Sequence, residues 1–203
     1  MTEIPLLIAT TNQGKKREIE AELFEFPVRS LSLADLKIFE SFPETGETFL
    51  DNARGKSLFY SQKWDGITLA EDSGLEIEYL NGAPGVHSAR FSNPGATDEK
   101  NNDKILFLLE QVPDSKRKAR FVSFMVLSQK GIVITELEGW VEGTITRERR
   151  GENGFGYDPL FFYPPLNRTF GQLSNQEKNK VSHRGQALLK LKAFLKDYLG
   201  INP

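Results

Sequence analysis

The chain contains no cysteine, and among its 203 residues there are only 2 histidines. Without cysteine, disulfides, thiolate metal sites and cysteine nucleophiles are all excluded. No stretch reaches the roughly 20 consecutive apolar residues that a transmembrane helix needs, so no membrane partner is expected. The apolar run near the N-terminus is short and follows an early acidic residue, which is not typical of a secretory signal peptide. These absences predict a cytoplasmic protein.

An excess of one charge is also missing, because 26 Lys and Arg residues oppose 28 Asp and Glu residues. Proteins that coat polymeric nucleic acid or anionic membranes are usually strongly basic, so neither partner is expected here. A small anion held by a local cluster of side chains agrees better with this balance. The hydrophobic fraction of 38% and charged fraction of 27% are ordinary for a globular protein. The length fits a single domain over residues 1–203.

Hydrophobic periodicity predicts alternating strands and helices. Helices are expected over residues 15–26, 49–64, 97–111 and 183–199, with Thr48 and Thr97 as N-caps. Strands are expected over residues 4–10, 67–71, 75–80, 119–128, 132–146 and 157–163, and irregular structure over 31–42 and 147–153, the latter as a flexible loop. Because some strands are joined by turns and others by helices, the pattern indicates an α/β fold with a mixed sheet.

A polar loop follows the first predicted strand and leads into the first predicted helix. It consists of Thr10, Thr11, Asn12, Gln13, Gly14 and Lys15. Backbone N–H groups at a helix start, hydroxyls and one lysine can together bind phosphate oxygens. The GxxxxGK[ST] spacing of a P-loop is absent, so an ordinary strand–helix turn with a surface lysine stays an alternative.

Two acidic residues lie at the end of the strand predicted over residues 67–71. Asp72, beside Glu71 and followed by Ser73 and Gly74, could bind a hard cation such as Mg²⁺ or activate a water. Adjacent side chains on a strand point to opposite faces, so Glu71 and Asp72 can share an ion only if the strand ends here, which Gly74 favours. Glu44, in a Pro-Glu-Thr-Gly loop, could supply a second ligand. The alternative for each is a solvated surface acid.

Asn52 and Lys56 lie four residues apart, so they share one face of the helix predicted over residues 49–64. Lys56 could contact a phosphate, or it could simply face solvent.

A glycine-flanked aromatic segment and a later cationic segment form the third cluster. The first contains Phe155, Gly156, Tyr157 and Asp158, and the second contains Lys178, His183 and Arg184. Cations near an exposable ring suit a flat, electron-rich ligand such as a nucleobase. Lysine and arginine only donate hydrogen bonds, so they favour a ring carbonyl over a ring amino group. The alternative is aromatic core packing beside a cationic helix start.

Together these segments resemble the inosine triphosphate pyrophosphatase (Ham1/RdgB-like) family, the noncanonical purine nucleoside triphosphate pyrophosphatases. The resemblance covers nearly the whole chain. It is carried by LIATTNQGK at 7–15, PETGETFLDNARGKS at 43–57, LAEDSGLEIEYLNGAPGVHSARF at 69–91, GFGYDP at 154–159 and EKNKVSHR at 177–184.

The resemblance implies Mg²⁺-dependent hydrolysis of ITP, dITP and XTP to the monophosphate and pyrophosphate, which cleanses the nucleotide pool. It implies a homodimer and an elongated mixed sheet with flanking helices, with two lobes around a central cleft. By the same resemblance, Thr10 to Lys15 and Ser73 contact phosphate, Asp72 binds the metal and activates water, and Glu44 is a further metal ligand. Phe155 to Asp158, Lys178, His183 and Arg184 match the base pocket. Gln172 departs from the glutamate found in many members.

Two other functions use the same features. A nucleotide sensor or RNA-end-binding module would bind without turnover, but clustered acids would repel phosphates in the absence of a metal. A Maf-like pyrophosphatase would act on dTTP, UTP or modified pyrimidines. The Ser182-His183-Arg184 segment with its nearby lysines favours a purine.

Overall fold

A computed structural model describes residues 3–200 of the chain. Its strands are β1 (Ile4–Ile8), β2 (Val28–Leu31), β3 (Ile67–Ile77), β4 (Lys118–Gln129), β5 (Ile132–Ile145), β6 (Phe161–Tyr163) and β7 (Arg168–Thr169). Its α-helices are α1 (Gln13–Leu23), α2 (Phe49–Ser61), α3 (Asp98–Leu108), α4 (Asn175–Val181) and α5 (His183–Tyr198). Short 3₁₀ helices include η2 (Gly85–Arg90) and η5 (Phe170–Gln172). No helix within residues 3–200 has the length and apolar character needed to cross a bilayer.

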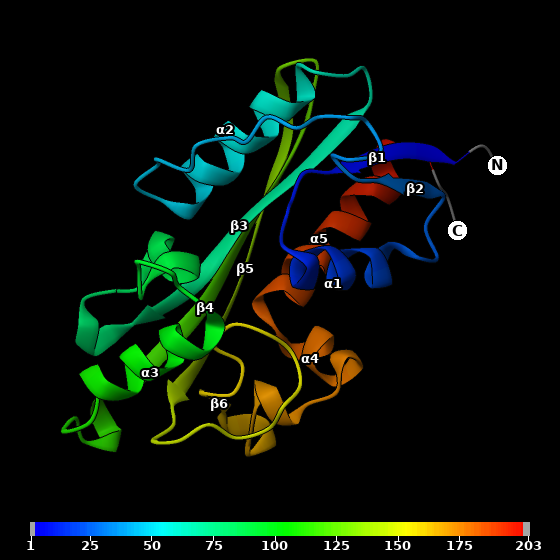
Figure 1. Cartoon of the computed structure of the whole chain (residues 1–203). Helices are drawn as coiled ribbons and strands as arrows, with labels where there is room; N and C mark the ends of the chain where they lie inside the picture. Colours follow the sequence, from blue (N-terminus) through cyan, green and yellow to red (C-terminus); the bar gives the residue numbers. More distant parts are fainter. Residues whose placement is uncertain (1–2, 201–203) are drawn as a thin grey trace. The chain divides into compact units, whose positions relative to one another are not determined.

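The strands form a 7-stranded sheet in the order β2-β1-β3-β4-β5-β6-β7 (Figure 1). β1 pairs in parallel with β2 and with β3, whereas β6 pairs antiparallel with both β5 and β7. The predicted α/β fold with a mixed sheet and flanking helices is therefore confirmed.

The chain forms two compact units. Unit 1 contains the chain up to Asp72, Ser123–Glu138 and the chain from Gln186 onward; unit 2 contains Ser73–Val122 and Gly139–Gly185. Strands β3, β4 and β5 each contribute residues to both units. The single domain over residues 1–203 stays a prediction.

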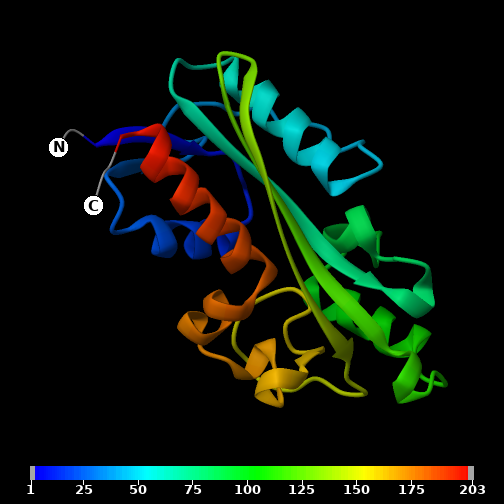
Figure 2. The same ribbon diagram turned by 180° about the vertical axis from the view of Figure 1, so that it is seen from behind.

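In unit 1, the alternation of side chains along β1 builds a core on each face of the sheet. Leu6 and Ile8 belong to a cluster with residues of α1 and α5, whereas Leu7 and Ala9 belong to a cluster with Tyr60 of α2. Adjacent residues on a strand point to opposite faces, so α1 and α5 cover one face and α2 the other. Both ribbon views agree with this arrangement (Figures 1 and 2).

Unit 2 has a core rich in aromatic rings. The ring centroids of Phe121 and Phe161 are 4.6 Å apart, and those of Phe161 and Phe170 are 4.9 Å apart. Leu75, Ile105 and the other members of this cluster are buried around them. These ring contacts pack β6 and η5 against β4 in this unit.

Arg117 is a buried cation in unit 2 whose hydrogen-bond partners are backbone carbonyls. Its guanidinium donates to the oxygens of Leu109 at 2.6 Å, Ile145 at 2.8 Å and Thr146 at 2.7 Å. Because each of these carbonyls would lose a charged donor, we expect Arg117→Met to lower the free energy of unfolding by about 3 to 5 kcal/mol. Urea denaturation followed by circular dichroism measures this loss.

Arg120→Met is the matched control for Arg117→Met. Arg120 lies three positions along the chain, and its half-exposed side chain pairs with Glu76 at 2.5 Å. An exposed ion pair contributes roughly 0–1 kcal/mol, so this variant should unfold close to the unmodified protein. Equal losses in the two variants would contradict the structural role given to Arg117.

Some predicted element boundaries are right and others are wrong. Thr48 and Thr97 accept hydrogen bonds from Asp51 and Lys100 as N-caps, as predicted. The predicted break between residues 71 and 75 is wrong, because β3 runs unbroken from Ile67 to Ile77. β1 and β4 pair on either side of β3, and such pairing outweighs the weak strand preference of one glycine.

Several short elements differ from the sequence prediction. The strand predicted over residues 157–163 is reduced to β6, and β2, β7 and α4 were not predicted. The segment predicted as a flexible loop at 147–153 is hydrogen-bonded within unit 2. Arg150 N–H donates to Pro159 O and Asn153 N–H donates to Gly171 O, both at 2.9 Å. These bonds give the segment a defined path beside Pro159 and Gly171.

Candidate functional site

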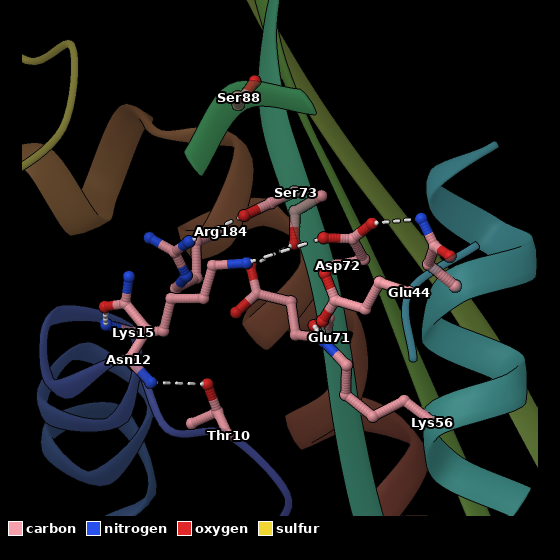
Figure 3. Close-up of polar contacts among 12 residues, drawn as sticks. Thr10, Asn12, Lys15, Glu44, Lys56, Glu71, Asp72, Ser73, Ser88 and Arg184 are labelled. Atoms are coloured by element: carbon pink, nitrogen blue, oxygen red, sulfur yellow. Dashed lines mark hydrogen bonds and ion pairs between the residues drawn. The ribbon is translucent and has the colours of Figure 1, made fainter. Parts of the chain in front are cut away.

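The loop from Thr10 to Lys15 forms the N-cap of α1. The Lys15 N–H donates to Oδ1 of Asn12 at 3.0 Å, and the Asn12 N–H donates to Oγ1 of Thr10 at 3.2 Å (Figure 3). α1 begins at Gln13, whose Nε2 donates to Thr11 O at 3.5 Å. The next residue, Gly14, is buried. The side-chain oxygen of Asn12, Oδ1, is therefore used for capping. Phosphate binding by this loop stays a prediction, for which the other N–H groups of the first turn and Lys15 are the available donors.

Asp72 is a buried carboxylate of unit 1. Its Oδ2 accepts a hydrogen bond from Nδ2 of Asn52 at 3.1 Å, and its Oδ1 lies 3.9 Å from Nζ of Lys15 (Figure 3). Only 6% of the residue is exposed. Burial raises the pKa of Asp72 above its ordinary value, although the positive charges of Lys15 and Lys56 oppose that rise. A carboxylate with a raised pKa is a better proton acceptor than an exposed one.

Lys56 contacts both Glu44 and Glu71. Its Nζ forms an ion pair with Glu44 and donates to the Glu71 carbonyl at 3.2 Å. The Glu71 carboxylate accepts a hydrogen bond from Oγ of Ser123 at 2.8 Å. Asn52 and Lys56 share one face of α2, as predicted from their spacing, and both contact the acidic residues in the middle of β3.

The unbroken β3 changes the expectation for Glu71. Along a continuous strand, neighbouring side chains point to opposite faces, and Glu71 and Asp72 accordingly contact different partners. We expected a strand end at Gly74 that would let both side chains face one ion, and this expectation is therefore wrong. Ser123, which hydrogen-bonds Glu71, was not identified from the sequence, because it lies 52 positions away.

The acidic residues of unit 1 fit a partly hydrated hard cation. Within residues 3–200 no group of three or more His, Cys, Asp or Glu side chains is placed to hold a metal ion. Mg²⁺ often binds through only one or two carboxylates and completes its shell with waters and substrate phosphates. The charge of Glu44 contributes to the raised pKa of Asp72, so the two carboxylates are near enough to interact. Asp72 and Glu44 thus remain the candidate ligands.

Phe155 lies at the centre of the cluster in unit 2. Nζ of Lys178 is 4.7 Å from its ring centroid, and Cζ of Arg184 is 5.5 Å from it. Lys178 Nζ also pairs with Oδ2 of Asp158 at 2.6 Å, and Arg184 donates to Oγ of Ser73 at 3.0 Å. Lys178 and Arg184 are each only 2% exposed. Two buried cations beside one ring create a strongly donating, flat surface.

Two residues assigned to the base pocket from the sequence are packing residues in the structure. The His183 ring stacks on Phe121 at 4.7 Å and is 4% exposed. The Tyr157 ring lies in the core of unit 2, and its hydroxyl donates to Ser88 O at 2.7 Å. Contact between these two side chains and a base stays a prediction, and the structure gives both a role in supporting the cluster.

Two adjoining helices carry the cations of this cluster. α4 carries Lys178 and starts with a capping box between Ser174 and Glu177. Hydrogen bonds from Ser174 and Arg168 lower the pKa of Glu177 to about 2. α5 begins at His183, so Arg184 stands in its first turn. A Cβ at Gly185 would collide with the backbone of Asn179, so glycine permits the close approach of α4 and α5.

Gln172 also has a structural explanation. Its Oε1 accepts hydrogen bonds from the Thr169 N–H at 3.0 Å and from the Thr169 hydroxyl at 3.3 Å, which completes a capping box at the start of η5. Glutamine and glutamate both serve in this motif. The departure at Gln172 therefore leaves the local fold intact.

The structure thus brings most predicted residues into one of two clusters. Thr10, Asn12, Lys15, Glu44 and Asp72 belong to unit 1, whereas Ser73, Phe155, Asp158, Lys178 and Arg184 belong to unit 2. Asp98 and Asn102, which contact Gly156, were missed because no local pattern links them to it.

Known proteins similar to this chain cover almost its full length. The model of the Ham1 family matches residues 6–194. A dITP/XTP pyrophosphatase from Thermoanaerobacter sp. (strain X514) is 47% identical over 190 residues, covering 94% of this chain and 96% of the relative. Another from Bacillus cereus (strain ATCC 14579) is 44% identical over 199 residues, with 95% of each chain covered. A HAM1 protein structure from Coxiella burnetii has a TM-score of 0.87 and 38% identity, covering 96% of this chain and 99% of that one.

Proposed function

Since this chain belongs to the Ham1 family and is an enzyme, we propose that it hydrolyses noncanonical purine nucleoside triphosphates, namely dITP, XTP and ITP. The products are the nucleoside monophosphate and pyrophosphate, and the reaction would cleanse the nucleotide pool. The observation that carries the proposal is Phe155 with Lys178 and Arg184 buried beside its ring. The relatives are named dITP/XTP pyrophosphatases, which supports the same substrate class.

The base is assigned to the cluster in unit 2. A purine ring stacks on Phe155, and the donors of Arg184 and Lys178 face an oxo group at position 6. Hypoxanthine and xanthine carry that acceptor, whereas adenine carries an amino group that would meet other donors. Buried donors left without an acceptor discriminate strongly against the wrong ligand.

The triphosphate is assigned to the residues of unit 1. A Mg²⁺ ion held by Asp72 and Glu44 would supply neutralisation of the phosphate charge. Asn52 orients the Asp72 carboxylate through its hydrogen bond to Oδ2, and Asp72 orients the attacking water and accepts its proton. The water oxygen bonds to the α-phosphorus as the bond to the bridging oxygen breaks, and the electron pair leaves with pyrophosphate. Lys15 and the N–H groups of α1 stabilise the charge on that leaving group.

A substrate panel tests this function directly. Pyrophosphate release is measured with ITP, XTP, dITP, GTP, ATP, dTTP and UTP, each with Mg²⁺ and with excess EDTA. We expect turnover of ITP, dITP and XTP at least about 100-fold above that of ATP, since a buried site built around donors rejects a mismatched edge by large factors. EDTA should abolish it.

The same panel separates the alternatives. Tight binding of ITP without pyrophosphate release would indicate a nucleotide sensor, and faster hydrolysis of dTTP or UTP would indicate a Maf-like enzyme. Either result would overturn the proposed function. The homodimer and the cytoplasmic location remain predictions from the resemblance and the composition.

A further inference from the structure

Both backbone polar groups of Gly156 are held by side chains from the first turns of α3. Oδ2 of Asp98 accepts a hydrogen bond from the Gly156 N–H at 2.7 Å, and Nδ2 of Asn102 donates to the Gly156 carbonyl at 2.8 Å. These contacts join segments 58 and 54 positions apart in the chain. Gly156 directly follows Phe155, the ring assigned to the base.

The geometry of α3 presents these two side chains together. Asp98 and Asn102 are four residues apart and therefore share a helix face. Thr97 fixes the start of the helix by accepting a hydrogen bond from Lys100 N–H at 3.2 Å. Nδ2 of Asn102 also donates to the Asp98 carbonyl at 2.7 Å, and Asn102 is only 3% exposed. The pair is a preorganised donor and acceptor, aimed at one residue.

The loop that it holds is intrinsically adaptable. Gly154 and Gly156, on either side of Phe155, have φ angles of 76° and 61°, in the left-handed region that glycine adopts readily. Phe155 N–H donates to Oδ2 of Asp158 at 2.9 Å, which fixes the residue on its N-terminal side. The bonds from α3 fix it on the other side. Without them, the ring could leave its place beside Lys178 and Arg184.

We propose that Asp98 and Asn102 are positioning residues that hold the Phe155 ring against the purine and thereby set the enzyme's purine selectivity. The inference rests on the proposed function. Neither side chain is assigned a contact with the nucleotide, so their removal should weaken binding of the base and leave the chemical step at the phosphate unchanged. A residue that only supported the fold would instead lower the amount of active enzyme, which reduces kcat.

The test uses Asn102→Ala and Asp98→Ala in the full chain, with dITP and dATP as substrates. Loss of one such hydrogen bond corresponds to roughly a 5- to 20-fold change, and we expect KM for dITP to rise by that factor while kcat stays within about twofold. The dITP-over-dATP ratio of kcat/KM should fall in parallel. IMP affinity, measured by calorimetry, provides a readout independent of turnover and should weaken by the same factor.

Two further variants make the result specific. Asp98→Asn keeps an oxygen acceptor for the Gly156 N–H and should restore much of the affinity lost in Asp98→Ala. Glu99→Gln changes the neighbouring acid in the same helical turn, which is exposed, and should behave like the unmodified enzyme. If Asn102→Ala does not fold, Asp98→Ala and Asp98→Asn still decide the question, because Asp98 is exposed.

The outcomes separate this inference from the proposed function. If the unmodified enzyme hydrolyses dITP but the variants keep normal KM and selectivity, or lose only kcat, the positioning role alone is overturned. Unmodified enzyme that hydrolyses none of the purine triphosphates would overturn the proposed function itself.

Discussion

Asp72→Asn is expected to lower kcat for dITP by roughly 10³- to 10⁴-fold while leaving IMP affinity within a few fold. Asparagine keeps the shape of Asp72 but cannot accept the proton of the attacking water, and it is a weaker ligand for a hard cation. The base contacts proposed in unit 2 involve Phe155, Lys178 and Arg184 and should be unaffected. Single-turnover kinetics with saturating Mg²⁺ measures the chemical step directly.

The control for Asp72→Asn lies on the same strand. Glu76 of β3 pairs with Arg120 on the surface, and Glu76→Gln should leave kcat unchanged. Near-normal turnover in Asp72→Asn would remove Asp72 from its assigned role.

Stability provides a second check on the same variant. Because burial raises the pKa of Asp72, the folded protein binds this proton more tightly than the unfolded chain does. Stability is therefore lost as pH rises from the unfolded pKa through the raised folded pKa, when the buried carboxyl ionises. At pH 7 without metal, Asp72→Asn avoids that loss, so its Tm should equal or exceed that of the unmodified protein. A lower Tm would mean that the pairing with Lys15 outweighs the cost of burial.

The parts of the fold that sequence analysis predicted correctly depend on local signals. Thr48 and Thr97 are caps because a side-chain oxygen meets an N–H three residues later, and this is visible in the sequence. α4, which was not predicted, has the same kind of signal, since Ser174 and Glu177 form a capping box. β2 and β7 are short, and their existence depends on pairing with β1 and β6, which no local pattern specifies.

In the candidate site, too, residues with a local signal could be predicted and residues that depend on distant contacts could not. Lys15, Asp72, Phe155 and Arg184 could be found because their residue types suit phosphate, metal and base. Their supporting residues could not, because support comes from positions distant in the chain, such as Ser123 for Glu71 and Asp98 for Gly156. Gly74 does not end the strand for the same reason, since pairing of β3 with strands on both sides overrides a local preference.

Arg184→Ala is expected to raise KM for dITP by roughly 30- to 150-fold and to reduce the preference for dITP over dATP by a similar factor. Arg184 is buried, donates to Ser73 and lies 5.5 Å from the Phe155 ring, so its removal deletes a buried charged donor beside that ring. Losing a hydrogen bond made by a buried charged group commonly costs about 2 to 3 kcal/mol, which corresponds to the factor given.

Arg168→Ala is the matched control for Arg184→Ala, because Arg168 is a half-exposed arginine of unit 2 that pairs with Glu177 at 2.7 Å. Its removal should leave both KM and the dITP-over-dATP ratio within about twofold, since exposed ion pairs contribute little. A chemical rescue distinguishes lost charge from lost packing: guanidinium added to Arg184→Ala should restore part of the affinity for dITP and none for dATP. Selectivity that is unchanged in Arg184→Ala would mean that another group reads the six position of the purine, and the assignment of the base to this cluster would fail.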